Sequence, residues 1–335
     1  MTTATAQGLE ARQSPGAVPA IKTEDLRKTY KSPRGDVEAV RGVSLEVKAG
    51  EFFGLLGPNG AGKSTTIGML TTLVHPTGGK AMVAGYDVVK DPVGVQRRIG
   101  VVTQNNTLDM QLTVSENLEF RSRFFGLSAG ESKRRAAQLI DAFGLGERRK
   151  AMASDLSGGQ SRRLLIARAL VHKPDVLFLD EPTAALDPQT RVNLWSILRV
   201  LHEQGQTVLL TTHYMEEAEE LCDRVAVVDH GLVLAEGTVD ELKENAGAVT
   251  IVTLRFEETI NPDFPERTGV NAWPGVTSTE AGGDQIKVFS REPEGLLGEL
   301  VALGAKEGLH VRDAATQKPS LETVFLTLTG REYRE

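Results

Sequence analysis

The stretch GPNGAGKST, at residues 57–65, decides the fold of this chain. It matches the pattern G-x-x-x-x-G-K-[ST], whose backbone amides curl around a phosphate group. An apolar segment at 52–56 precedes it, and a helical pattern follows to about Leu73. A strand, a glycine loop and a helix in this order are the context that a phosphate-binding loop needs. The sequence therefore predicts an α/β fold with a nucleotide site at the end of a buried strand.

Each residue type in this loop has a role in holding a triphosphate. Glycines allow the tight backbone path, and the start of the following helix favours negative charge. Lys63 is predicted to reach the β- and γ-phosphates, and the Ser64 hydroxyl is predicted to hold Mg²⁺. The predicted nucleotide contacts in this loop are Gly57, Pro58, Asn59, Gly60, Ala61, Gly62, Lys63, Ser64 and Thr65.

A second motif, VLFLDEPT at residues 176–183, places two carboxylates after a fully apolar strand. The carboxyl edge of a parallel sheet is the usual place for an acid that meets Mg²⁺ beside a bound nucleotide. Asp180 fits that role. Glu181, the next residue, is better placed to polarise an attacking water. Adjacent carboxylates repel each other, which argues against a purely structural role for the pair.

A third motif, LSGGQ at residues 156–160, distinguishes among phosphate-loop proteins. Ser157, Gly158 and Gly159 are predicted to cap a helix that starts near Gln160. A helix start with bare amides and a serine is a second anion site. With these three motifs the chain resembles the ATP-binding subunits of ABC transporters, whose signature is LSGGQ.

This resemblance implies a fold and a set of partners. The implied fold is α/β, a phosphate-loop ATPase core with a mixed sheet and an inserted helical subdomain. In the family two subunits face each other head to tail, so that the loop with Ser157, Gly158, Gly159 and Gln160 completes the γ-phosphate site of the other copy. The implied partners are a second copy, or a related ATPase, and a separate transmembrane permease. The implied cofactors are ATP and Mg²⁺.

Four further positions match the family one by one. Tyr30 corresponds to an aromatic that stacks on adenine, and Asp187 to an aspartate at the dimer interface beside the nucleotide. Gln104 corresponds to a glutamine that reaches Mg²⁺ and the attacking water, and His213 to a histidine that contacts the γ-phosphate. The resemblance thus implies the catalytic residues Glu181, His213, Lys63 and Gln104, and the metal ligands Ser64, Gln104 and Asp180.

The chain departs from the family pattern in small ways. Ala185 stands where many relatives have glycine, Ser161 where a basic residue is common, and Thr103 where proline is common. None of these changes removes a catalytic group. Within the family, the segments at 108–127 and 319–332 resemble antibiotic-resistance ATPases of the daunorubicin-exporter type.

The chain is expected to divide into three parts. Residues 1–20 are rich in Ala, Thr, Gln, Gly and Pro and predict a disordered tail. Residues 21–245 are the predicted ATPase domain, with the helical subdomain at about 105–173. Residues 246–335 are a predicted accessory α+β domain. Its expected strands lie at 250–256, 285–289 and 310–312, and its expected helices at 293–303 and 319–329.

Composition limits the function classes. The 335 residues carry a net charge of −7, which argues against a nucleic-acid binder that works through bulk positive charge. The single cysteine, Cys222, excludes a disulfide within the chain and favours a reducing compartment. No apolar run approaches the ~20 residues that span a bilayer. We therefore expect a cytoplasmic protein that is peripheral on the inner face of the cell membrane through its permease partner.

The favoured function is the ATP-hydrolysing subunit of an ABC exporter. Residues 105–127 are expected to form the face on which the permease rests, with Leu112, Phe120, Phe124 and Phe125 as candidate contacts. The acidic run at 216–220 is expected to be a solvated helix face. Two alternatives stay open: the ATPase of an importer or of a mechanotransmission complex, and a non-transport ABC ATPase. The transported molecule is not encoded in this chain, because its path lies in the partner.

Overall fold

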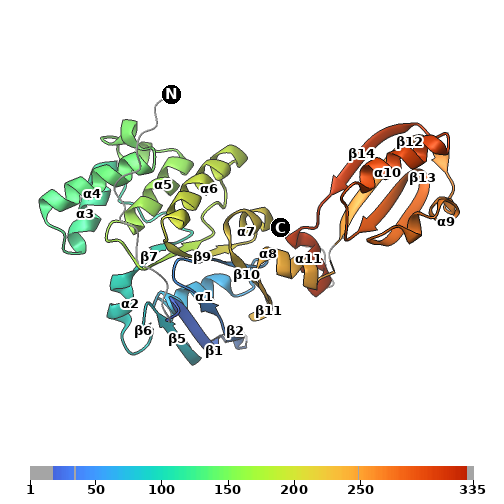
Figure 1. The fold of residues 1–335 in the computed structure, drawn as a ribbon. Coiled ribbons are helices and arrows are strands. Elements are labelled where there is room, and N and C mark those ends of the chain that lie inside the picture. Colours follow the sequence, from blue (N-terminus) through green and yellow to red (C-terminus); the bar gives the residue numbers. More distant parts are fainter. Residues whose placement is uncertain (1–17, 34, 248, 330–335) are drawn as a thin grey trace. The chain divides into compact units, whose positions relative to one another are not determined.

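A computed structural model of the chain describes residues 18–33, 35–247 and 249–329 (Figure 1). Most of the expected tail at 1–20 lies outside the described residues. The chain divides into two compact units, one ending at Val239 and the other beginning at Asp240. No helix in the described ranges is both long and apolar enough to cross a membrane.

A six-stranded sheet forms the centre of the first unit, in the order β11-β10-β4-β9-β8-β7. All neighbours are parallel except β10 and β11, which form an antiparallel hairpin. Every residue of β4, β8 and β9 is buried, as expected for parallel strands covered on both faces. The strands are β4 (Phe52–Leu56), β7 (Ile99–Val102), β8 (Val176–Asp180), β9 (Thr207–Thr212), β10 (Arg224–Asp229) and β11 (Leu232–Gly237).

The register of this sheet brings three strand ends together. Leu56 of β4 lies opposite Thr212 of β9, and Asp180 of β8 lies opposite Thr211. The chain leaves all three strands at the same edge. The glycine loop, Glu181 and His213 are the segments that follow, so the pairing itself collects the three candidate elements.

A second, antiparallel sheet packs below the first. Its order is β2-β1-β5-β6, with β3 paired to β1. Helix α1 (Lys63–Leu70) lies between the two sheets, and Ile67, Met69 and Leu70 are buried with residues of both (Figure 1). The strands are β1 (Ile21–Tyr30), β2 (Val37–Val43), β3 (Glu46–Val47), β5 (Gly78–Val83) and β6 (Tyr86–Asp87). Helix α1 ends three residues earlier than expected, because Thr72 turns the chain with a φ of 65°.

Helices cover the other face of the six-stranded sheet. Capping boxes fix two helix starts, Thr113 with Glu116 and Ser128 with Glu131. Apolar residues of these helices share one core with the sheet, for example Leu118 and Ile140 with Leu177. The helices of this unit beyond α1 are α2 (Pro92–Arg98), α3 (Val114–Phe124), α4 (Ala129–Ala142), α5 (Gly158–Ala169), α6 (Pro188–Glu203) and α7 (Met215–Leu221).

The second unit is built on a three-stranded antiparallel sheet in the order β13-β12-β14. Val252, Leu254 and Phe256 of the central strand pack with Leu296 and Leu300 in a separate core. The strands are β12 (Thr250–Ile260), β13 (Val276–Ser290) and β14 (Val311–Gln317). The helices are α8 (Val239–Asn245), α9 (Phe264–Thr268), α10 (Leu296–Lys306) and α11 (Leu321–Thr329). Strand β13 is ten residues longer than the expected 285–289, since it begins at Val276, and Gly283 lies opposite Ile260 at the far end of β12.

Candidate nucleotide-binding and hydrolysis site

The glycine loop joins β4 to α1 through a backbone that requires glycine. Gly62 caps the helix in the left-handed region, with a φ of 101°. A Cβ at this residue would lie 2.4 Å from the carbonyl oxygen of Ala39, closer than van der Waals contact permits. Gly60 also has a positive φ, of 83°. Glycine is therefore required at Gly62, where a side chain has no room, and is favoured at Gly60, where other residues rarely adopt the backbone conformation.

Lys63, the first residue of α1, is buried and folds back across the loop. Its Nζ donates to the carbonyl oxygens of Gly57 at 2.7 Å and Pro58 at 3.0 Å, and it lies 3.4 Å from Oε1 of Glu181. Burial lowers the pKa of Lys63, although the neighbouring carboxylate of Glu181 opposes that shift. The ammonium group is thus held by oxygens inside the loop, a position from which it can bind a phosphate oxygen.

Asp180, the last residue of β8, is surrounded by hydroxyl groups. Its Oδ1 accepts from Ser64 Oγ at 3.0 Å and from Thr211 Oγ1 at 2.6 Å. The side chains of Ser64 and Asp180, from two different elements, therefore meet directly. A hydroxyl and a carboxylate oxygen are hard ligands that suit Mg²⁺, so this pair fits the ion that the sequence predicts.

Glu181 meets three candidate catalytic groups from three different segments. Its carboxylate lies 3.4 Å from each of three nitrogens, Lys63 Nζ, His213 Nδ1 and Gln104 Nε2. Only about 10% of the side chain is exposed. The backbone has a φ of 46°, an uncommon value for a non-glycine residue, and such strain persists where the surroundings fix it. Residues far apart in the sequence thus converge on this one carboxylate.

Arg162 of α5 connects the candidate site to the helical subdomain, and the sequence analysis missed it. This buried guanidinium donates to four carbonyl oxygens: Thr103 and the consecutive residues Asp180, Glu181 and Pro182. Burial lowers its pKa. The contacts fix the backbone just before Gln104 and on both sides of Glu181. An arginine on the helix that follows LSGGQ was the available signal, but sequence alone does not tell which face it occupies.

Glu217 of α7 corrects one expectation. The run at 216–220 was predicted to be a solvated face, yet Glu217 is fully buried, and Trp195 Nε1 donates to its Oε1 at 3.1 Å. Burial raises its pKa, and neighbouring hydroxyls of Thr212 and Thr183 oppose the shift. The helical period explains the error, because Glu217 lies on the same side of α7 as the buried Ala218 and Leu221. Of the four glutamates, only Glu216 and Glu220 are exposed.

The signature segment forms a helix start of its own. Ser157 is the N-cap of α5, its Oγ accepts from the Gln160 amide, and Gln160 Oε1 accepts from the Ser157 amide. The helix begins at Gly158, two residues before the expected start, because this reciprocal cap already orders both glycines. Gly159 packs against α6: a Cβ there would lie 2.3 Å from Cγ2 of Thr190. The signature and the start of α6 are therefore neighbours.

Two further candidates lie at element ends. Asp187 is the N-cap of α6, and hydrogen bonds from Thr190 lower its pKa. Ala185, two residues earlier, has a φ of 61°, in the left-handed region that glycine adopts more readily than alanine. Tyr30 ends β1 and is 40% exposed, with Lys28 Nζ 5.0 Å from the centre of its ring. Its ring face is thus in contact with a cation on an open surface.

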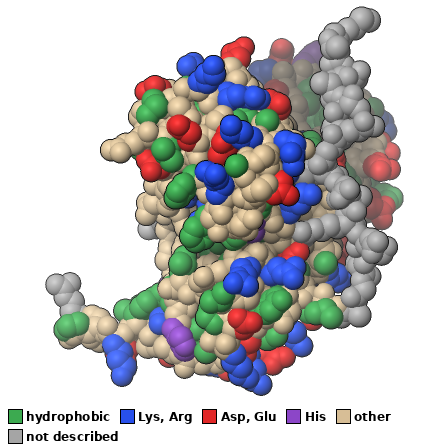
Figure 2. Space-filling model, turned by 90° about the vertical axis from the view of Figure 1, so that its left-hand side faces the viewer, with side chains coloured by type: hydrophobic (Ala, Val, Ile, Leu, Met, Phe, Trp, Pro, Cys, Tyr) green, Lys and Arg blue, Asp and Glu red, His purple; other side chains and the backbone are tan. Residues whose placement is uncertain are grey.

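A cleft of about 1040 Å³ lies between α3 and the sheet. Three arginines and a histidine line it, and no carboxylate does within the described residues: Arg97, Arg121, Arg168 and His172. Phe124 at its rim is 73% exposed, and the nearby Phe120 is 68% exposed. On the face of the molecule shown in Figure 2, exposed hydrophobic side chains and basic side chains stand next to each other.

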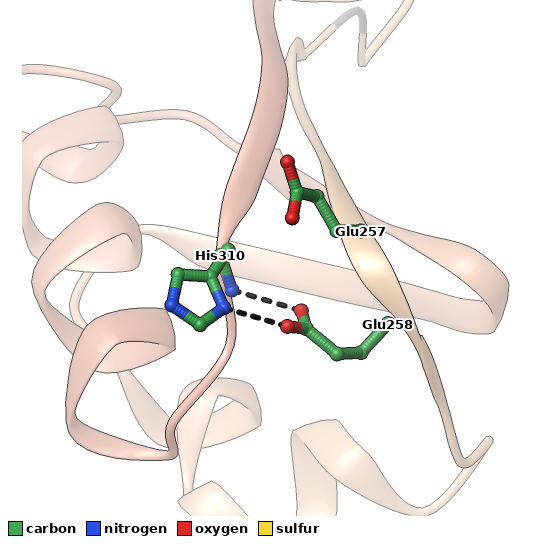
Figure 3. A group of neighbouring side chains, drawn as sticks. All are labelled: Glu257, Glu258 and His310. Atoms are coloured by element: carbon green, nitrogen blue, oxygen red, sulfur yellow. Dashed lines mark hydrogen bonds and ion pairs between the residues drawn. The ribbon is translucent and has the colours of Figure 1, made fainter.

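One more cluster of potential metal ligands lies in the second unit (Figure 3). His310 Nδ1 lies 2.6 Å from Glu258 Oε1, and the His310 amide donates to Oε2 of the same carboxylate at 2.9 Å. Figure 3 marks no hydrogen bond or ion pair to the carboxylate of Glu257, which has an oxygen within 4.8 Å of the other two ligand atoms. These contacts describe an exposed ion pair that joins β12 to the residue before β14.

Comparisons with known proteins agree with the motifs. A family model described as "ABC transporter" matches residues 40–184. The daunorubicin/doxorubicin resistance ATP-binding protein DrrA of Streptomyces peucetius is 46% identical over 93% of this chain and 92% of its own length. The Nod factor export ATP-binding protein I of Ralstonia nicotianae is 39% identical over 96% and 97%. A dimeric ATP-binding cassette solved in a post-hydrolysis state with ADP and Pi gives a TM-score of 0.60 at 32% identity, covering 65% of this chain and 98% of that one.

Proposed function

The chain belongs to the ABC transporter family of ATP-binding proteins, and on that premise we propose that it powers an exporter by hydrolysing ATP between two copies of itself. Membership makes it an ATPase that serves a transporter. The direction of transport, the residues that act and the partners are the proposal. The observation that carries it is the convergence of Lys63, Gln104 and His213 on the buried carboxylate of Glu181.

The proposed chemistry divides the work among these residues. Glu181 orients a water molecule for attack on the γ-phosphorus and accepts its proton, while the bond to the ADP oxygen breaks. Lys63 and His213 stabilise the negative charge on the transferring phosphoryl group. Ser64 and Asp180, with the side-chain oxygen of Gln104, would hold Mg²⁺, which neutralises phosphate charge when bound.

A two-fold dimer would complete each site. The first turn of α5 carries Ser157 and bare amides that suit a phosphate group. The start of α6, with Asp187 as its N-cap, lies next to this turn because Gly159 packs against Thr190. We place this combined surface against the γ-phosphate bound to the partner copy's glycine loop. Tyr30, exposed at the end of β1, would stack on the adenine.

The cleft beside α3 is the proposed docking site for the permease. The exposed Phe124 at its rim and the nearby Phe120 suit the apolar side of a short helix from the permease. Of the four expected contacts, Leu112 and Phe125 are partly buried, and Phe125 stacks on His172 with ring centres 3.7 Å apart. Docking there would hold the chain at the cytoplasmic face of the membrane.

Export rather than import is proposed because of the relatives. One relative is named for resistance to two drugs and another for export of Nod factor, and each aligns over more than nine tenths of this chain. The chemical identity of the cargo is left to the permease.

The test compares purified wild-type chain with Glu181→Gln. We expect Mg²⁺-dependent hydrolysis in the wild type, loss of turnover in the variant, and a dimer of the variant that forms only with ATP in size-exclusion chromatography. Glu216→Gln, an exposed neighbour of the buried Glu217, is the matched control and should behave as wild type. Normal hydrolysis by Glu181→Gln would remove this residue from the mechanism, and ATP binding without dimerisation would remove the composite site.

A further inference from the structure

A second cavity lies in the first unit, away from the nucleotide site. It measures about 310 Å³ and is bounded by α4, the end of α5 and the second half of α6. Its wall is largely apolar, formed for example by Leu139, Phe143, Ile197 and Val200. None of the candidate nucleotide residues lines it. The volume is at the lower end of the range typical for small-molecule sites, about 300–1,000 Å³.

One wall of this cavity carries a buried positive charge. Arg135 is 93% buried, with only 7% of its surface exposed. Its Nη2 donates to the carbonyl oxygen of Leu170 at 2.7 Å and its Nε to that of Val171 at 3.3 Å. Within the described ranges, no carboxylate lies among the residues that line the cavity, and no ion pair involves Arg135.

The missing counter-charge is unusual. Buried arginines are normally paired with an acid, because an ion loses its hydration when it leaves water. Burial is the cause of the lowered pKa of Arg135, and no acidic neighbour offsets it. The guanidinium nevertheless remains charged at neutral pH. The cavity therefore combines an apolar wall with a cation that lacks an anion.

A second polar group at the cavity lacks a partner. Gln204, at the C-terminal end of α6, lines the cavity, and its Oε1 is buried with no hydrogen-bond donor among the described residues. A buried polar atom of this kind calls for an occupant that can form a hydrogen bond with the side-chain amide of Gln204.

We propose that this cavity binds an apolar carboxylate, that is, a medium-chain fatty acid or a molecule of that class. Its carboxylate pairs with Arg135, its hydrocarbon chain lies against Leu139, Ile197 and Val200, and the amide of Gln204 hydrogen-bonds to its polar end. Such an occupant contacts α5 and α6 at the ends opposite to Ser157 and Asp187. The proposal does not depend on the direction of transport or on the permease.

The test is isothermal titration calorimetry of the full chain with octanoate, octanol and octylamine. We expect octanoate to bind at least tenfold more tightly than octanol, and octylamine to bind more weakly than either. Equal binding of octanoate and octanol would overturn the proposal, because the cavity would then recognise only apolar surface.

Three variants locate the binding. Val200 lines the cavity and is half-exposed, so the larger side chain in Val200→Trp can fill the cavity. This variant should abolish octanoate binding while leaving Arg135 in place. Arg135→Gln should abolish the preference for octanoate, and Arg134→Gln, its exposed neighbour on α4, should leave it unchanged. Arg135→Gln can fail to fold, since Arg135 holds the carbonyls of Leu170 and Val171 just after α5, in which case Val200→Trp decides. Wild-type binding of octanoate by folded Val200→Trp would contradict the proposed site.

Discussion

Among the residues that the structure describes, two glutamate–histidine pairs occur, and the shorter one is not the candidate catalytic pair. Glu258 and His310 of the second unit lie 2.6 Å apart, whereas Glu181 and His213 lie 3.4 Å apart. The side chains of the first pair are 37% and 75% exposed, and those of the second 10% and 15%. His310 and Glu258 contact mainly each other, while Glu181 also meets Lys63 and Gln104. Burial and convergence, rather than a short contact, distinguish a site from a surface ion pair.

The largest expected difference between the two pairs is in ATP hydrolysis. His213→Ala should lower kcat about 10²–10³-fold, because a charge-stabilising group in a buried site is lost. His310→Ala should leave kcat within about twofold. Steady-state assays of both variants at saturating ATP measure this contrast. Comparable losses in the two variants would mean that the second unit takes part in turnover.

The next largest difference is expected in the loss of stability when a buried or an exposed arginine is replaced. Arg162→Ala leaves four carbonyl groups without their donor and should cost about 3 kcal/mol. Arg312→Ala removes only a half-exposed pair with Asp284 and should change stability by less than about 1 kcal/mol. Urea unfolding can separate the units, since Trp195 reports on the first and Trp273 on the second. A small effect of Arg162→Ala would show that water can replace the guanidinium.

The smallest expected effect is on the pH dependence of stability, to which His172 and His310 contribute with opposite sign. Burial lowers the pKa of His172 to about 4, so its contribution to stability is complete above pH 6.5 and is lost as the pH falls towards 4. The hydrogen bond to Glu258 raises the pKa of His310, so its contribution is complete below 6.5 and is lost as the pH rises through the folded-state pKa. Proton NMR titration of the ring signals measures both values. Titration of His172 near 6.5 would contradict its burial against Phe125.

The sequence predicted the candidate site more completely than it predicted what supports the site. Lys63, Asp180 and Glu181 follow strands whose apolar runs are unmistakable, and a parallel sheet collects strand ends at one edge. The resemblance to ABC transporter subunits is confirmed by relatives that align over most of the chain. Arg162 and Glu217 were not found, because their burial depends on how helices pack against distant segments. A charged residue on a helix has no local signal that distinguishes a buried position from a solvated one.

In the second unit the sequence predicted the three strands and the helices α10 and α11, but it missed α9 and some of the element limits. Strand β13 begins at Val276, nine residues before the expected strand, and the residues 276–284 carry no regular alternation of apolar and polar side chains that would have predicted this. The boundary between the units lies at residues 239–240, a few residues before the change in composition near 245.

The cap of α5 allows one hydroxyl to serve two hydrogen bonds at once. Ser157 Oγ uses a lone pair to accept from the Gln160 amide, and that bond leaves the hydroxyl proton available to donate. A phosphate oxygen at this helix end would take the proton without opening the cap. Each bond would polarise the hydroxyl in the direction that strengthens the other. Helix capping and anion binding at this serine are therefore mutually reinforcing, and a serine-to-alanine change would remove a donor and an acceptor together.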